Sequence, residues 1–535
     1  MSENSKVATT VFQYFISDEM RDRKITLDSL SIENLNSFDI LIEFSSPIST
    51  FRNHDYTWVD LSQDRIANDF SPKVIRLQNG LYVQANCNLG IWEVNAKNTK
   101  QLLWRFNPEF AGPITQYSNE NNTKKIVSAQ TDFNFSEKLA LLITSKGVVE
   151  LSRSLIPFSA IACFTDHCDF DTSQNLKIQR EFFKEKGIKI TKGFFLNHFS
   201  KREDNASWQN DSKELQKWIE DGHELGYHSL SQSLKSNEDS FNDFNSFIPP
   251  LNIPIWIDHG YQNYNFSLYQ KNGVSDIDFS NNLKNKNIQV LWNYIDSGTA
   301  TFGVINQLNT SQFTLNSFWK GIKNKSLKKK VSLLIKNSIC HFYADNQLIS
   351  DYAKLASSYK FFSKTKSFTA FFELLKKCTA IFIPLFKIFI LWNSTKNKIY
   401  PFAKYSPIFF EHNIGNENFI VFQTLELIDF IETLNKKSID KLISENGLFI
   451  GHTYFSVPMD YHDGKFFSSS SEINFKVARN FNYLGEKIAQ EKIWNPTLSE
   501  LLNHYKNYKN TFFDMDEKGT IFIIENCNIP YRYFS

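Results

Sequence analysis

The chain has 535 residues, more than one ordinary domain holds, so we expect two to four domains. Its 41% hydrophobic and 22% charged residues supply enough apolar surface for folding, which excludes a chain that is mostly disordered. Lys and Arg number 59 and Asp and Glu number 57, so the net charge of +2 provides no broad basic surface for nucleic acid. We therefore expect neither DNA nor RNA as a partner.

The cysteines and the N-terminal residues bear on the compartment. The six cysteines show neither C-x-x-C pairs nor the regular spacing of a disulfide framework, so we expect free thiols in a reducing compartment. The N-terminal segment MSENSKVATTVFQYFISDEM lacks a basic stretch followed by an unbroken apolar stretch, the pattern of a secretory signal. These features predict a cytoplasmic protein.

Short apolar segments separated by polar turns dominate the chain from about residue 39 to residue 151. Segments such as ILIEF, KVIRL, GIWEV and LALLIT are typical of antiparallel strands. We predict that residues 1–152 form a β-rich N-terminal domain.

Strands and helices alternate from about residue 153 onward. The apolar strand SAIACFT precedes a helix that stops at Gly187, and the strand IKITKGFFL precedes a helix that stops at Gly222. This alternation favours an α/β fold with a parallel sheet, whose functional groups gather at the carboxyl ends of the strands.

The same pattern returns near the C-terminus. FIVFQT is followed by a helix over LELIDFIETLNKKSIDKLISENG and by the strand LFIGHTYF. Thr497 and Glu500 then form the capping box of a further helix. We therefore assign residues 153–309 and 411–535 to two parts of one barrel.

Residues 310–410 form an insertion of different character, which we predict to be helical. Lysine-rich segments precede FTAFFELLKKCTAIFIPLFKIFILW, residues 368–392, in which Lys and Pro interrupt the apolar residues. The apolar part is too short for a membrane-spanning helix. One interpretation is a helix that lies on a membrane surface, which predicts peripheral membrane contact; the other is a helical hairpin that buries the same phenylalanines.

The densest set of metal-capable side chains directly follows the strand SAIACFT. Asp166, His167, Asp169 and Asp171 occupy four of six consecutive positions. Their carboxylates would repel one another unless a positive charge lay among them, and a divalent metal is the natural counter-ion.

Three further histidine segments lie downstream. They are DGHELGYHS with His223 and His228, IWIDHG with Asp258 and His259, and LFIGHTYF with His452. Most of these clusters directly follow apolar strands, so they can converge on one barrel mouth.

These segments resemble the polysaccharide deacetylases, the NodB-homology domains of carbohydrate esterase family 4. Thr165 and Asp166 with Asp169 are similar to the first motif of that family, and the strand that ends at His452 is similar to its last motif. The most specific match is the second motif, to which Gly222, His223, Glu224, Gly226, His228 and Ser229 correspond.

The resemblance covers about residues 158–300 and 420–460 and implies a NodB-like distorted (β/α) barrel. It implies a hydrolase of non-peptide carbon–nitrogen bonds that removes an N-acetyl or similar acyl group from a sugar. Because a secretory signal is lacking, we expect an intracellular polysaccharide or lipid-linked precursor of a surface glycan as substrate, with the protein in the cytoplasm or at the inner membrane face.

The resemblance also implies roles for individual residues. Asp166 would act as general base and His452 as general acid. His167, Asp169 and His228 would bind a divalent metal, zinc or similar. The family also has a substrate-groove motif, and the segment in its place would put four residues against the substrate, namely Trp256, Asp258, His259 and Gly260.

Two departures from the family pattern leave alternatives open. Gln232 stands where the family has its second metal-binding histidine, so either His167 supplies the missing imidazole or the site has decayed. The order TDHCD leaves the base and ligand roles of Asp166 and Asp169 interchangeable. The alternatives are a catalytically inactive carbohydrate-binding relative that acts as an assembly subunit, and a hydrolase of another amide or of a formyl group.

Overall fold

The computed structural model describes residues 10–27, 32, 35–118, 123–292, 301–343, 346–390, 397–458, 462–524 and 528–535. The chain divides into two compact units. The larger unit comprises Met1–Asp296, Ile305–Leu308 and Tyr405–Ser535, and the smaller comprises Ser297–Val304 and Asn309–Lys404.

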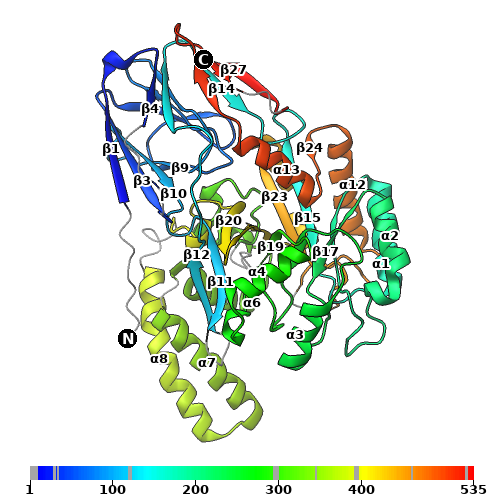
Figure 1. The fold of residues 1–535 in the computed structure, drawn as a ribbon. Coiled ribbons are helices and arrows are strands. Elements are labelled where there is room, and N and C mark those ends of the chain that lie inside the picture. Colours follow the sequence, from blue (N-terminus) through cyan, green and yellow to red (C-terminus); the bar gives the residue numbers. More distant parts are fainter. Residues whose placement is uncertain are drawn as a thin grey trace. The chain divides into compact units, whose positions relative to one another are not determined.

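Two sheets at the start of the larger unit share one hydrophobic core (Figure 1). The first has the order β1 (Thr10–Ile16), β3 (Phe38–Phe44), β10 (Gln101–Phe106), β9 (Ile91–Val94) and β6 (Arg65–Ala67). The second has the order β2 (Arg23–Thr26), β13 (Ala140–Thr144), β8 (Tyr82–Ala85), β7 (Val74–Leu77), β4 (Ile48–Arg52) and β5 (Trp58–Val59). Along β10, Leu102, Trp104 and Phe106 are buried while the residues between them are half-buried, the alternation of a strand with one face in a core. The pairs are antiparallel except β1 with β3.

The C-terminal residues complete this β-rich region. Strand β27 (Tyr531–Phe534) pairs with β14 (Val148–Leu151). Arg532 and Arg52 both bind the buried carboxylate of Glu150, with Arg532 Nε 2.6 Å and Arg52 Nη2 2.8 Å from Glu150 Oε1. The first and last parts of the chain therefore build this region together. Two smaller hairpins are β11 (Pro113–Ser118) with β12 (Thr123–Ser128), and β25 (Phe513–Met515) with β26 (Ile521–Ile523).

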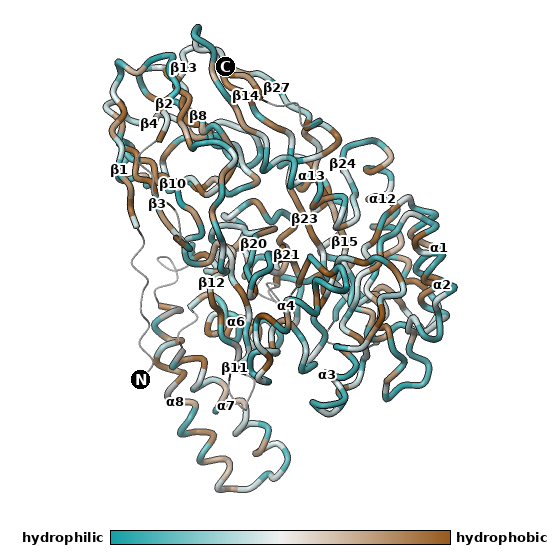
Figure 2. Tube along the Cα trace, in the orientation of Figure 1, coloured by the Kyte–Doolittle hydropathy of each residue, from teal (hydrophilic) through white to brown (hydrophobic). Residues whose placement is uncertain are grey.

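A ten-stranded sheet, curled into a half-barrel, forms the α/β part of the larger unit. Its order is β20 (Phe409–Ile414), β21 (Glu417–Phe422), β19 (Val290–Trp292), β18 (Ile255–Ile257), β17 (Glu224–His228), β16 (Thr191–Phe194), β15 (Ala160–Asp166), β23 (Leu448–Thr453) and β22 (Leu425–Glu426), with β24 (Ile493–Trp494) beside β15. All pairs are parallel except β20 with β21. Strands such as β15 and β23 are mostly apolar and fully buried, as expected for parallel strands covered on both faces (Figure 2). The predicted mixed α/β fold with a parallel sheet is therefore confirmed.

The helices of this part begin and end at the residues that the sequence marks. Helix α1 (Ser173–Lys186) ends at Gly187, which has a φ of 63°. Helix α13 (Leu498–Lys509) begins with the predicted capping box of Thr497 and Glu500. The others are α2 (Trp208–Glu220), α3 (Asn237–Ser246), α4 (Asp276–Asn285), α10 (Phe430–Thr433), α11 (Lys436–Ser444) and α12 (Phe475–Ala489).

The prediction of a single helix over residues 425–447 is wrong. The segment forms strand β22, the short helix α10 and helix α11. The Asp429 side chain accepts hydrogen bonds from the backbone N–H groups of Ile431 and Glu432, and the Asn435 side chain accepts one from that of Ser438. Two N-caps therefore start two helices where the apolar periodicity indicated one.

The smaller unit is helical. It contains α5 (Leu315–Gly321), α6 (Leu327–Asn337), α7 (Asn346–Thr365) and α8 (Phe368–Ile390), and α7 and α8 pack together as a hairpin. Among the described residues of the whole chain, no helix combines the length and the apolar character needed to cross a membrane.

Candidate metal centre at the carboxyl ends of the sheet strands

Parallel strands bring the predicted histidine segments to one edge of the sheet. His167 directly follows β15, and His228 is the last residue of β17. His452 lies near the end of β23, opposite Thr165 of β15 in the strand register. The carboxyl ends of these strands lie together, so residues far apart in sequence become neighbours.

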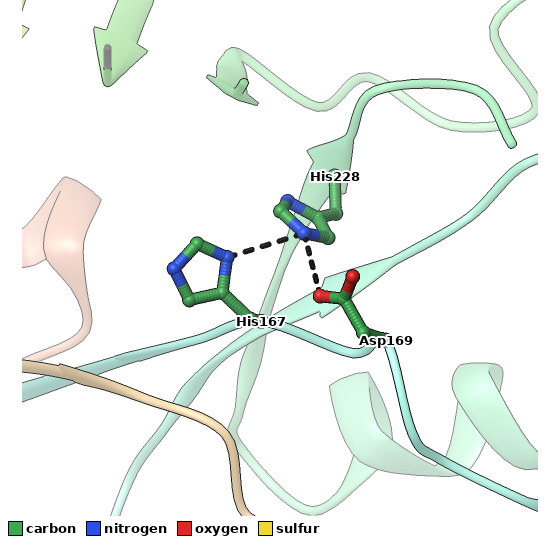
Figure 3. Close-up of side chains that lie close together, drawn as sticks. All are labelled: His167, Asp169 and His228. Atoms are coloured by element: carbon green, nitrogen blue, oxygen red, sulfur yellow. Dashed lines mark hydrogen bonds and ion pairs between the residues drawn. The ribbon is translucent and has the colours of Figure 1, made fainter. Parts of the chain in front are cut away.

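His167, Asp169 and His228 form a compact buried group (Figure 3). His228 Nε2 lies 3.1 Å from His167 Nδ1 and 3.0 Å from Asp169 Oδ2. One ligand atom from each residue lies within 4.8 Å of the other two. The three residues predicted to bind metal are thus brought together in an arrangement that could hold a metal ion.

The protonation states of this group suit a cation. Burial would raise the pKa of Asp169, but the positive charge of His259 and the hydrogen bonds from His259 and His228 hold this pKa well below its usual range. Burial, together with the neighbouring imidazoles of His452 and His228, lowers the pKa of His167 well below the ordinary value. Burial also lowers the pKa of His228. Metal ligands must be neutral imidazoles and ionised carboxylates, and these shifts favour both forms.

His259 contacts the second oxygen of the same carboxylate. Its Nδ1 lies 3.0 Å from Asp169 Oδ1, and its Nε2 donates to the main-chain carbonyl of Gln232 at 2.8 Å. Burial would lower the pKa of His259, but the charge and hydrogen bond of Asp169 raise it above the ordinary value. The residue expected to touch substrate therefore lies where it orients the carboxylate of the metal-capable group.

The side chain of Gln232 forms hydrogen bonds within the loops beside this group. Its Nε2 donates to the backbone carbonyl of Asp169, and its Oε1 accepts from the Ser200 hydroxyl. Its side chain therefore positions Asp169 through the main chain, and the described contacts give it no part in the ligand group.

His452 stands against the metal-capable group. Its ring centroid is 3.8 Å from that of His167 and 4.3 Å from that of Trp292. Its Nδ1 lies 2.6 Å from Thr165 Oγ1, whereas its buried Nε2 has no hydrogen-bond partner among the described residues. Burial, together with the neighbouring imidazole of His228, lowers the pKa of His452 well below the ordinary value, so the ring is neutral at pH 7. One ring nitrogen is fixed and the other is available for proton transfer.

Asp166 lies outside this group, in a buried ion cluster on the helix-facing side of the sheet. Its carboxylate binds Lys192 Nζ, which also binds Asp171 and lies 2.9 Å from Gln179 Oε1 on α1. Side chains alternate along a strand, so Asp166 points away from the side that its neighbours Thr165 and His167 occupy. Burial raises its pKa to about 8 despite the Lys192 charge. This position does not support the role of general base implied by the resemblance.

The other residues expected to line the substrate groove, Trp256, Asp258 and Gly260, belong to a hydrogen-bonded strand end and loop of the protein. Asp258 accepts hydrogen bonds from Trp256 Nε1 at 3.2 Å and from the backbone N–H groups of Phe266 and Ser267 at 3.0 and 2.9 Å. Trp256 and Asp258 are fully buried, and burial raises the pKa of Asp258 to about 6. Gly260 has a φ of 50° in the loop that these bonds hold.

His223, from the most specific motif, faces the opposite end of its strand. Its Nδ1 accepts from the backbone N–H of Ile190 at 3.2 Å, and burial lowers its pKa to about 4.

Two aromatic residues of the site were missed by sequence reasoning. Tyr454 stacks on His167 with ring centroids 4.3 Å apart, and Trp292 packs on both His167 and His452. Their positions at or just after the ends of β19 and β23 were the only signal in the sequence.

Comparisons with known proteins returned no family. No protein-family model matches the chain, and no curated protein matches it. The functional argument therefore depends on the geometry of this site and on the motifs of the sequence.

Proposed function

We propose that the protein is a metal-dependent hydrolase that removes an N-acetyl or similar acyl group from a sugar. The observation that carries this proposal is the buried group of His167, Asp169 and His228, with the free ring nitrogen of His452 beside it. The choice of a sugar amide depends on the resemblance of residues 222–229 and of the strand ending at His452 to polysaccharide deacetylases. A polysaccharide or a lipid-linked glycan precursor would carry the acylated sugar.

The donor atoms fit a divalent metal such as zinc. Two imidazoles and one carboxylate are the ligands that catalytic zinc sites use, and three protein ligands leave a position for water or substrate. A ring nitrogen carries at most one hydrogen, yet His228 Nε2 has two close polar neighbours, His167 Nδ1 and Asp169 Oδ2. A cation shared by the three atoms would satisfy all of their lone pairs. His259 would orient the carboxylate from outside, as second ligand shells commonly do.

Hydrolysis of an amide by water requires two proton transfers, one from the water and one to the departing amine. A divalent cation bound by the three ligands would polarise the acyl carbonyl and lower the pKa of water. His452 is neutral and has Nε2 free, so it can take the proton of the attacking water and deliver it to the amine nitrogen. Thr165 holds the other ring nitrogen and fixes the orientation of the ring. Water and the amide then become a carboxylate, such as acetate, and the protonated amine.

Metal analysis and an acetate-release assay test this proposal. Protein purified without chelator should contain about one equivalent of a divalent metal and release acetate from N-acetylglucosamine oligomers, and chelation should stop the release. Formate release from N-formyl sugars without acetate release would assign a different acyl group. Protein that binds no added zinc, manganese or cobalt would contradict the proposal.

The second candidate is a catalytically inactive carbohydrate-binding relative that acts as an assembly subunit. Gln232 favours it, because this residue stands where the family has a metal-binding histidine and both ends of its amide are engaged in the loop. This candidate predicts oligosaccharide binding that is independent of metal and gives no turnover. The same titrations, carried out with and without chelator, distinguish the two.

A further inference from the structure

Positive charge is concentrated in the smaller unit. Residues 309–404 contain 17 lysines and no arginine, against three acidic residues, which gives a formal charge of +14. The remaining residues contain 42 basic and 54 acidic side chains, a formal charge of −12, so the near-neutral total conceals a strong separation. A segment with this excess of lysine attracts an anionic surface.

The helical hairpin of this unit buries only one apolar side of α8. Ile381 and Leu385 join a buried cluster with Leu348 of α7 and with Ile339. Lys377 Nζ lies 2.7 Å from the Ser358 hydroxyl of α7, which marks the same inward side of α8. These contacts account for the packing of α7 on α8.

A second apolar stripe runs along α8 on the side away from α7. Its members recur every three to four residues or at twice that interval, the spacing of one helix face. The stripe consists of Phe368, Phe372, Leu375, Phe382, Phe386 and Ile390, with exposed fractions between 46 and 77%. A helix that packs on one neighbour in water needs one apolar face, and α8 has two.

Lysines flank this stripe. Lys376 and Lys387 lie beside it on α8, and Lys360, Lys364 and Lys366 lie at the end of α7 and in the turn between the helices. Exposed Tyr359 and Phe361 stand among the lysines of α7. Aromatic and aliphatic side chains bordered by lysines are typical of helices that lie in the headgroup region of a bilayer.

We propose that α8, presented by the α7–α8 hairpin, docks on an anionic phospholipid membrane. The Phe, Leu and Ile side chains of the stripe enter the headgroup and acyl boundary while the flanking lysines meet anionic headgroups. The hairpin lies on the membrane without crossing it, in agreement with the absence of a spanning helix among the described residues. Nucleic acid would also attract the lysines, but it gives the exposed Leu and Ile side chains no apolar environment, so the stripe favours lipid.

Vesicle flotation of the full chain tests the proposal. The protein should float with vesicles of phosphatidylcholine and phosphatidylserine in equal parts at low salt, and float poorly with phosphatidylcholine alone. The triple variant Phe372→Ser, Phe382→Ser, Phe386→Ser should lose flotation, because it removes the apolar contact. Lys376→Gln with Lys387→Gln should weaken the partition about tenfold or more. These side chains lie outside the hairpin core, so unchanged circular dichroism is expected for every variant.

The matched control is Phe475→Ser with Lys476→Gln, which removes an exposed phenylalanine and an adjacent exposed lysine from α12 in the larger unit. Flotation of this variant should equal that of the unmodified chain. Failure of the unmodified chain to float with anionic vesicles at low salt would overturn the proposal. Binding to duplex RNA or to a second copy of the chain that survives the serine substitutions, without binding to vesicles, would assign the lysines to that partner instead. None of these outcomes depends on metal or on turnover.

Discussion

At the scale of single residues, two histidines from one segment of the sequence have different surroundings in the structure. His228 points into the group with His167 and Asp169, whereas His223, five positions earlier, accepts a backbone hydrogen bond at the other end of β17. The motif resemblance includes both residues but implies a metal-binding role for His228 alone. Their different contacts predict opposite results on mutation.

His228→Ala should weaken the binding of zinc about 100-fold or more, since the loss of a first ligand exceeds the 10–100-fold effect of outer partners. Competition titration with a chromophoric chelator measures this affinity. His223→Asn is the matched control, because the Asn side-chain oxygen can accept from the Ile190 N–H in place of Nδ1. Equal metal affinity of the two variants would show that His228 is not a ligand.

His259→Gln should lower metal affinity by about 10–100-fold without abolishing binding, because it loosens the Asp169 carboxylate. The groove position implied by the resemblance predicts a different result, a raised KM with unchanged metal affinity. Metal titration and steady-state kinetics on the same preparation separate the two roles.

His452→Asn should reduce turnover roughly 100-fold or more while metal content stays the same, because the variant lacks the ring nitrogen that transfers the proton. Acetate release and metal analysis are the two measurements. A variant with normal turnover would make His452 a packing partner of Trp292 and His167 only.

At the scale of elements, Lys192 and its carboxylates join three parts of the α/β region. Lys192 on β16 binds Asp166 at the end of β15 and Asp171 in the following loop, and Gln179 of α1 completes the cluster. All of these residues are buried, so the ionic contacts are protected from water. The cluster belongs to the connection of strand and helix and not to the metal-capable group.

Asp166→Asn should therefore lower the free energy of unfolding, and it should not remove a group that takes part in catalysis. The variant loses one of the two carboxylates that bind buried Lys192, which should lower the free energy of unfolding by about 1.5–3 kcal/mol, as urea unfolding measures. The triple variant Asp166→Asn, Asp171→Asn, Lys192→Met should recover part of this loss, because no uncompensated charge then remains in the cluster. Unchanged stability with lost turnover in Asp166→Asn would restore the general base role.

At the scale of the whole molecule, buried neutral histidines make stability depend on pH. The pKa of His223 and that of His412 are each lowered by burial to about 4, and each ring accepts a backbone N–H at Nδ1, from Ile190 and Gln130 respectively. In the unfolded chain these rings titrate near their ordinary value of about 6.5. Between these two values the unfolded state binds more protons than the folded state, so the stability falls as the pH falls from about 6.5 toward 4.

Between pH 7 and pH 5 the His223 ring alone should cost about 2 kcal/mol of the free energy of unfolding. Urea unfolding at the two pH values measures the total loss. His223→Asn should show a smaller loss than the unmodified chain, since its side chain does not titrate in this range. An equal loss in both would show that His223 does not contribute to the pH dependence.

Sequence by itself determined the elements and most members of the candidate site. Alternation of strand and helix indicated a parallel sheet, and Thr497 with Glu500 marked a helix start, because these signals act over a few residues. The polar cluster after β15 and the histidines after later strands indicated one shared edge, since parallel strands end together. The choice of His167, Asp169 and His228 among these residues as metal ligands came from the resemblance to polysaccharide deacetylases.

The tertiary structure alone decided which side chains face that edge. Asp166 points away from the side chain of His167 because side chains alternate along a strand, and it binds Lys192, which lies 26 positions later in the sequence. His259 contacts Asp169 although the two residues are 90 positions apart in the sequence. The helix expected over residues 425–447 was split by side-chain caps that compete locally with the apolar periodicity. Such pairings depend on which segments the sheet places side by side, and the local preferences of the sequence do not contain that information.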